Sequence, residues 1–214
     1  MLSRLYTNGC SLTYHTAIAK EDQWSAILGK MLDIPIVIND GQGCGSNERI
    51  FRRTYEYLQH NKEFNNETLF LIQLTWPFRF EYYQSDKTWA SINQESVVCN
   101  DQTHGRQLLN LRSKYYTPEE NSYRFLQQVT SLEYLFKSFD IKNYYFISAY
   151  KDDDESIEYI KFLDDNITWL YKTFHKSYYF HNLFTKISEA DGHPDKEGNE
   201  LIANWIAKGL SLRE

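Results

Sequence analysis

The chain has 214 residues, which is long for one average domain and short for two, so we expect a single domain over residues 1–214. Its formal net charge of −6 disfavours a protein that binds nucleic acid, because such a protein needs a basic surface against the phosphates. No segment approaches the ~20 apolar residues of a membrane span, and MLSRLYTNGCSL lacks the pattern of an export signal. We therefore expect a cytoplasmic protein without a membrane span.

The alternation of predicted elements indicates an α/β fold. Short β-branched and aromatic runs predict strands at residues 2–7, 34–39, 68–74 and 144–150. Apolar residues at helical spacing predict helices at 22–32, 47–58, 125–139 and 196–210, and one or two helices within 155–174. Strands separated by helices are typical of a mostly parallel sheet covered on both faces. The prediction is a three-layer α/β/α sandwich with a mostly parallel sheet of five strands.

Residues 76–118 interrupt this alternation after the third strand. FRFEYYQ, KTWASIN and SVVCN look like short strands joined by polar turns, so we expect an insertion rich in aromatic residues. A connection of this length in a compact domain is usually functional, and its aromatic content favours a packed lid. Its stripe of aromatic side chains is interpreted as the core of the lid or as a platform for sugars, and comprises Phe78, Phe80, Tyr82, Tyr83 and Trp89.

Three loops carry residues with chemical potential. The first strand is followed by Gly9 to Thr13 (GCSLT), the second by Asp40 to Asn47 (DGQGCGSN), and the last helix is preceded by Asp191 to Pro194 (DGHP). Loops that follow parallel strands emerge at one edge of the sheet, so residues far apart in sequence meet there. We expect a hydroxyl, a glycine-rich loop and an acid–imidazole pair to meet at that edge.

These residue types fit acyl transfer. A serine hydroxyl becomes a nucleophile when a base takes its proton, and histidine titrates near neutral pH and can be that base. A carboxylate orients the imidazole and stabilises its charged form. Backbone N–H groups, such as those of Ser11 and of a glycine in 43–45, can stabilise the oxyanion, which is typically worth ~3 to 4 kcal/mol per donor.

The motifs resemble those of the SGNH hydrolases over nearly the whole chain. GCSL at 9–12 is similar to the GDSL block, with Cys10 in the aspartate place, GCGSN resembles the second block, and DGHP resembles the last. The resemblance implies Ser11 as the nucleophile, Gly45 or Gly43 as an oxyanion donor, His193 as the base and Asp191 as the orienting acid. It also implies a parallel sheet between helices.

The chain departs from the family pattern at two places. The usual acid lies three residues before the histidine, where this chain has Ala190, whereas Asp191 lies two before, so a triad and a Ser–His dyad both stay open. The third block, Gly-x-Asn-Asp, is replaced by QLTWPFR at 73–79. Candidate replacements for its asparagine are Thr75, Trp76, Arg79 and Asn47. Asn47 could equally be a helix cap, and Arg79 could bind a substrate anion or pair with Glu81.

Other interpretations of these residues stay open. Gly41, Gly43 and Gly45 before a helix could cradle a phosphate, although neither GxGxxG nor GK[ST] is matched. Cys10 could be the nucleophile, although a small cysteine is commonly buried. With no CxxC among the three cysteines and no ligand-like spacing among the histidines, we expect no metal and no cofactor; the residues concerned are Cys10, Cys44, Cys99, His15, His60, His104, His175 and His181.

The sequence therefore predicts an esterase that hydrolyses a small acyl group such as acetyl, on a small molecule or a carbohydrate, through a serine acyl-enzyme. A lipid-like acyl ester or a thioester is an alternative substrate. A second hypothesis is a binding or structural module of the same fold, with weak or no catalysis, that uses the aromatic insertion. A third is a nucleotide- or phosphate-binding domain. The sequence gives no indication of the oligomeric state.

Overall fold

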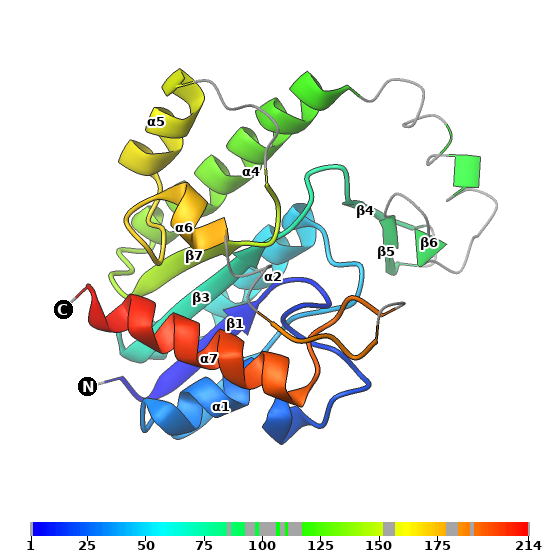
Figure 1. The fold of residues 1–214 in the computed structure, drawn as a ribbon. Helices are drawn as coiled ribbons and strands as arrows, with labels where there is room; N and C mark the ends of the chain where they lie inside the picture. Colours follow the sequence, from blue (N-terminus) through cyan, green and yellow to red (C-terminus); the bar gives the residue numbers. More distant parts are fainter. Residues whose placement is uncertain are drawn as a thin grey trace.

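The computed structural model describes residues 2–84, 87–92, 97–98, 106–107, 110, 117–151, 157–178, 184–188 and 191–213. Four parallel strands form its main sheet, in the order β2-β1-β3-β7 (Figure 1): β1 (Arg4–Asn8), β2 (Ile36–Asn39), β3 (Thr68–Leu74) and β7 (Tyr144–Ser148). A fifth parallel segment follows β7 as an isolated bridge, in which Phe146 N–H donates to Thr168 and Leu170 N–H donates to Phe146. The predicted parallel sheet is thus confirmed, with its fifth member shortened to a bridge.

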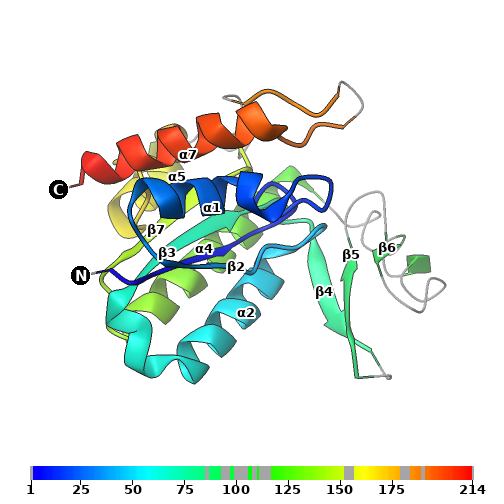
Figure 2. The same cartoon turned by 90° about the horizontal axis from the view of Figure 1, so that it is seen from below.

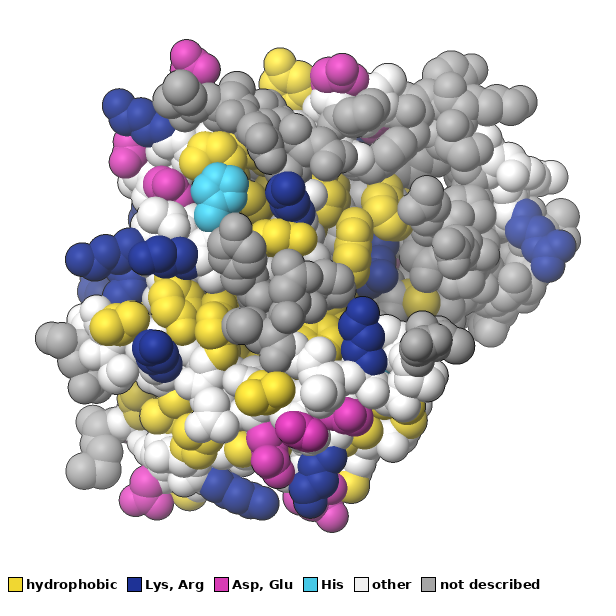
Figure 3. All heavy atoms as spheres, viewed as in Figure 1, with side chains coloured by type: hydrophobic (Ala, Val, Ile, Leu, Met, Phe, Trp, Pro, Cys, Tyr) yellow, Lys and Arg dark blue, Asp and Glu magenta, His cyan; other side chains and the backbone are white. Residues whose placement is uncertain are grey.

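Helices cover both faces of this sheet (Figure 2). One face carries α1 (Trp24–Met31) and α7 (Lys196–Ser211), and the other carries α2 (Asn47–His60) and α4 (Pro118–Ser138). After β7 come α5 (Ile157–Asn166) and α6 (Phe174–Tyr178), and the 3-10 turns η1 (Lys20–Asp22) and η2 (Lys62–Glu67) lie in the connections. The predicted three layers are confirmed. On the surface, Figure 3 shows charged side chains of both signs interspersed with apolar ones over α1 and α7.

Two helix predictions needed adjustment. Helix α4 begins at Pro118, not at residue 125, because Thr117 caps it by accepting from Glu120 N–H and a proline suits the first turn. In the described part of 155–174, where one or two helices were predicted, α5 ends at Asn166 and α6 begins only at Phe174, because the residues between them pair with β7. Local capping and strand pairing, which hydrophobic periodicity does not report, set both boundaries.

The alternation of side chains along the strands divides the core into two parts. Leu5, Leu69 and Leu71 face the layer of α1 and α7, and Tyr6 and Phe70 face the layer of α2 and α4. Every residue of β3 is buried, since this strand has a neighbour on each side and helices on both faces. Each layer therefore has its own apolar cluster on the shared sheet.

A second, antiparallel sheet follows β3 in the chain. Its strands are β4 (Phe80–Tyr83), β5 (Trp89–Ile92) and β6 (Val97–Val98), in the three places where short strands were predicted. Two hydrogen bonds from Arg52 of α2 to Glu81, at 2.8 and 3.0 Å, hold this sheet to the main domain. Cys99, His104, His181, Ala190 and the acidic run Asp152–Glu155 lie outside the described residues.

Among the described residues, no helix combines the length and apolar character that crossing a bilayer requires.

Candidate active site

The chain turns sharply after β1 because its first loop folds onto Gln73 of β3. Gln73 Oε1 accepts from the N–H and Sγ of Cys10, each at 3.2 Å, and from Thr13 Oγ1 at 3.1 Å. A Cβ at Gly9 would lie 2.2 Å from Thr13 Oγ1 and 2.8 Å from Gln73 Oε1, so only glycine fits there. Ser11 is half-buried at the carboxyl end of β1, and no described residue hydrogen-bonds to its hydroxyl. Cys10 is fully buried, which argues against it as a nucleophile.

The glycine-rich second loop packs directly on the first. A Cβ at Gly41 would meet Thr13 at 2.9 Å, and one at Gly45 would meet the Gly9 carbonyl oxygen at 3.0 Å. None of the described glycines has a positive φ; the left-handed residue of this loop is Cys44, at φ 59°. A left-handed backbone is therefore not the reason for glycine in this loop. The glycines permit close approach of two backbones.

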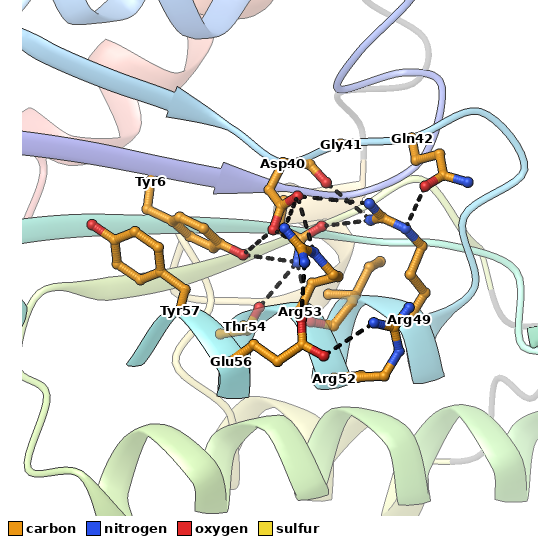
Figure 4. A network of polar contacts seen from close by, with 12 residues as sticks. Tyr6, Asp40, Gly41, Gln42, Arg49, Arg52, Arg53, Thr54, Glu56 and Tyr57 are labelled. Carbon is orange, nitrogen blue, oxygen red and sulfur yellow. Dashed lines mark hydrogen bonds and ion pairs between the residues drawn. The ribbon is translucent and has the colours of Figure 1, made fainter. Parts of the chain in front are cut away.

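A polar network around Asp40 holds this second loop on α2 (Figure 4). Arg53 donates to both carboxylate oxygens of Asp40 at 3.1 to 3.2 Å, and Tyr6 O–H donates to Oδ2 at 3.0 Å. Arg49 donates to the Asp40 carbonyl at 2.9 Å and to Gln42 Oε1 at 2.9 Å. Burial, reinforced by the Asp40 carboxylate, raises the pKa of Tyr6 well above its usual value, so Tyr6 stays a neutral donor. The network fixes the loop without using Ser11 or His193.

The third loop presents His193 from a small hairpin before α7. Ile187 N–H donates to the His193 carbonyl at 2.9 Å, and Asp195 N–H donates to Thr185 at 3.2 Å. Nδ1 of His193 lies 2.5 Å from Oδ1 of Asp191, which also accepts from His193 N–H at 3.1 Å. Hydrogen bonds from the side chain and then the backbone of His193 lower the pKa of Asp191, so the carboxylate is ionised at neutral pH. Asp191 thus contacts the ring although it lies only two residues away.

The first and third loops meet through two histidines. The rings of His15 and His193 stack with centroids 4.1 Å apart and planes 19° from parallel. Burial lowers the pKa of His15 and the neighbouring His193 lowers it further, while Asp191 acts in the opposite direction. His15 Nδ1 is shielded from solvent and has no hydrogen-bond partner in the described part of the chain. The loop of Ser11 and the loop of His193, nearly the whole chain apart in sequence, therefore lie side by side.

Two of the predicted oxyanion donors are already engaged. Gly45 N–H donates to the Gln42 carbonyl at 3.0 Å. The Asn47 side chain donates to the Thr75 carbonyl at 2.9 Å and to Gln128 Oε1 at 2.8 Å, and it accepts from Thr75 N–H at 2.9 Å. Asn47 is not the helix cap either, because Ser46 caps α2 by accepting from Arg49 N–H. Gly43 is exposed, and a Cβ there would meet nothing within 4 Å.

The loop after β3 carries the other candidates. Arg79 donates to Thr75 Oγ1 at 3.1 Å and lies over the Trp76 ring at 4.7 Å from its centroid. The predicted alternative pairing of Arg79 with Glu81 is wrong, because Glu81 binds Arg52. Arg79 Nε is buried without a hydrogen-bond partner, and no described carboxylate forms an ion pair with this guanidinium. Thr75 is fully buried, and Trp76 packs against both core clusters.

Sequence reasoning missed several residues that build this site. His15, Gln73 and Asn199 were not among the candidate site residues, although the side chain of each contacts or fixes one of the three loops. The only signal for Gln73 was a polar residue inside an apolar strand, TLFLIQL. A buried amide of that kind needs a partner, which here is the first loop.

Comparison with solved structures supports the fold. TesA has 12% sequence identity and a TM-score of 0.57 over 98% of both chains. The psychrotrophic esterase EstA from Pseudoalteromonas sp. has 11% identity and a TM-score of 0.56 over 99% of this chain and 98% of its own. A putative lipolytic protein of the G-D-S-L family from Desulfitobacterium hafniense has 15% identity and a TM-score of 0.50 over 97% and 99%. The resemblance to the SGNH hydrolases thus holds for the fold.

The sequence comparisons place the chain more specifically. No match was found among curated proteins. The model of a family of unknown function, DUF6071, matches residues 8–169, from the end of β1 to the segment that follows α5. Because this match covers well over half of the sequence, the chain belongs to the DUF6071 family.

Proposed function

We propose that the protein is a serine esterase that hydrolyses small acyl esters, such as acetyl esters, through an acyl-enzyme. The observation that carries the proposal is the contact of 2.5 Å between His193 Nδ1 and Asp191 Oδ1, on a hairpin that meets the Ser11 loop through the stacked histidines. With Nδ1 facing the carboxylate, Nε2 is the nitrogen left to take a proton from serine.

In this mechanism the Ser11 hydroxyl attacks the ester carbonyl carbon while His193 accepts its proton. The tetrahedral oxyanion then collapses, the alcohol leaves with the proton from His193, and Ser11 stays acylated. Water attacks the acyl-enzyme in the same way and releases the acid. Asp191 orients the imidazole and stabilises its charged form. The backbone N–H groups of Ser11 and Gly43 are the proposed oxyanion donors, since Gly45 and Asn47 are engaged elsewhere.

Arg79 is the proposed anchor for the rest of the substrate. It bonds to Thr75, which directly follows the carboxyl end of β3. The order of the strands reverses between β1 and β3, and open α/β sheets bind ligands at such a place. A guanidinium without a described counter-ion suits a carboxylate or phosphate near the ester. A carbohydrate ester is the proposed alternative substrate, since Tyr83 and Trp89 are 57% and 45% exposed and pack at 5.1 Å between ring centroids.

The test combines a fluorophosphonate probe with p-nitrophenyl acetate and an acetylated sugar. EstA has been solved inhibited by monoethylphosphonate, which makes an organophosphorus probe a sensible choice. Neither Ser11→Ala nor His193→Ala should be labelled by the probe. In each variant kcat should fall by about 10⁴-fold or more. Ser131→Ala, which removes an exposed hydroxyl on α4, is the matched control and should label like the wild type.

The result also separates the proposal from the binding-module hypothesis. If the wild type neither labels nor hydrolyses any of these esters, the esterase proposal fails. If the wild type is active, the variant Asp191→Asn distinguishes a triad from a dyad. A triad predicts a loss in kcat of about 10⁴-fold, whereas a dyad predicts little change.

A further inference from the structure

The arrangement of His15 deserves a chemical explanation beyond ester hydrolysis. A serine hydrolase site needs one imidazole beside one carboxylate, and His193 with Asp191 supplies both. The second imidazole is superfluous for that chemistry. Yet its Nδ1 is shielded from solvent without a described partner, which costs about 1 to 3 kcal/mol for an ordinary polar group.

We infer that His15, Asp191 and His193 form a binding site for a divalent transition metal of the zinc type. One possible ligand atom from each of the three residues lies within 4.8 Å of the other two. Two imidazoles and one carboxylate are the donor set that binds zinc in sites with an open fourth position. No other such group occurs among the described residues.

The geometry requires only a modest closure of the three side chains. Zinc bonds of about 2.0 to 2.2 Å in a tetrahedron place neighbouring ligand atoms roughly 3.3 Å apart. The stacked rings must therefore tilt so that their nitrogens converge. His193 and Asp191 have room to do so, because their side chains are 29% and 36% exposed. The same exposure leaves a fourth position for water.

The backbone around the site is held in place while the side chains adjust. Gln23 Nε2 donates to the His15 carbonyl at 3.1 Å, and the hairpin bond from Ile187 N–H holds the His193 carbonyl. Asp191 N–H donates to Ser188 Oγ at 2.9 Å. The ligands thus come from two loops whose main chains are fixed, as a preorganised metal site requires.

Metal binding and general-base catalysis by His193 would exclude each other. A metal at Nδ1 displaces the Asp191 carboxylate from the ring, and a metal at Nε2 takes the lone pair that would accept the serine proton. Zinc should therefore inhibit the esterase. This consequence rests on the proposed function, whereas the metal site itself does not.

The experiment measures binding directly and needs no activity. The untagged chain, stripped with a chelator, is titrated with Zn²⁺ by calorimetry and with Co²⁺ by visible absorption. One ion per chain is expected, with a tetrahedral or five-coordinate cobalt spectrum and without the near-ultraviolet thiolate band that a cysteine ligand would add.

The variants identify the ligands. His15→Phe keeps an aromatic ring against His193 but removes both nitrogens, and it should weaken Zn²⁺ binding at least about tenfold, as should Asp191→Asn. His60→Ala removes an exposed histidine of α2 and should bind like the wild type. If His15→Phe does not fold by circular dichroism, His15→Gln takes its place.

The outcomes decide the metal site independently of the esterase. No binding by the wild type, or unchanged binding by the folded His15 and Asp191 variants, would overturn the site. Ser11→Ala should bind Zn²⁺ as the wild type does while it lacks esterase activity. Failure of the esterase assay therefore leaves the metal result intact, and failure of the metal titration leaves the esterase intact.

Discussion

The main-chain N–H of Trp24 donates to Oδ1 of Asn199 at 2.9 Å, which joins the start of α1 to the first turn of α7. The indole of the same tryptophan donates to the Leu12 carbonyl at 3.0 Å, and Asn199 donates to the Pro194 carbonyl at 3.2 Å. Leu12 follows Ser11 and Pro194 follows His193. Two buried side chains thereby fix the backbone beside both proposed catalytic residues.

Replacing Asn199 tests this clamp. Asn199→Ala leaves the Trp24 N–H without its partner in a buried place and should lower the free energy of unfolding by about 2 to 3 kcal/mol. Urea titration of both proteins measures the difference. Asn204→Ala is the matched control on the same helix, because among the described residues its exposed side chain bonds only to the Glu200 carbonyl, and it should change stability by less than about 0.5 kcal/mol. Equal midpoints for the two variants would contradict the clamp.

A methyl group added at Gly9 should destabilise the protein, whereas one added at Gly43 should have almost no effect. Gly9→Ala forces Cβ to within 2.2 Å of Thr13 Oγ1, so the variant should lose about 1 to 3 kcal/mol and should disturb the Ser11 turn. Gly43→Ala places Cβ in open space at a φ that is not positive, so stability should stay within about 0.5 kcal/mol. The Gly43 N–H is kept, so its proposed role as donor survives. Thermal unfolding and ester hydrolysis of both variants check the pair.

Arg79 should select for substrates with a negative charge. Arg79→Gln removes the cation, so kcat/KM for the p-nitrophenyl hemiester of succinate should fall by about 10- to 100-fold, which corresponds to the usual 1.5 to 3 kcal/mol of a charged hydrogen bond. The neutral acetate ester should change little. Arg124→Gln is a suitable control, because that arginine already pairs with Glu48 at 2.8 Å. An equal loss on both esters would show that Arg79 only supports the loop.

The cap of α7 makes stability depend on pH in the acid range. Asp195 accepts from Thr185 Oγ1 at 2.6 Å and from Gly198 N–H at 2.7 Å, and these bonds, the first above all, lower its pKa. A lowered folded pKa means that the contribution is present above the unfolded value of about 3.9 and is lost as pH falls through the folded value. Because Asp195 is only partly buried, the contribution should stay below about 1 kcal/mol.

Comparing wild type with Asp195→Asn isolates that contribution, since asparagine is also a good cap but carries no charge. Urea unfolding at pH 6 should favour the wild type. The difference should shrink below about pH 4 and vanish at lower pH. A difference that is constant over this range would point to a cause other than the carboxylate charge.

The sequence by itself determined the fold class and the order of the layers. Short, nearly continuous apolar runs such as TLFLIQL and helical periodicity in α1, α2 and α7 are local patterns, and they predicted the sheet with helices on both faces. The motifs GCSL and DGHP also pointed to Ser11, His193 and Asp191, because a short motif after a strand or before a helix occupies a known edge of the sheet.

Only the tertiary structure decided which polar groups at this edge of the sheet are free to bind a substrate. Gly45 and Asn47 looked like free donors in sequence, but their partners Gln42, Thr75 and Gln128 are set by how the loops and α4 pack. For the same reason Glu81 pairs with Arg52 and not with Arg79. His15 stacks on His193, although almost the whole chain separates them in sequence. Hydrophobic pattern is a property of neighbours along the chain, whereas hydrogen-bond and ion-pair partners depend on contacts between distant segments that folding alone creates.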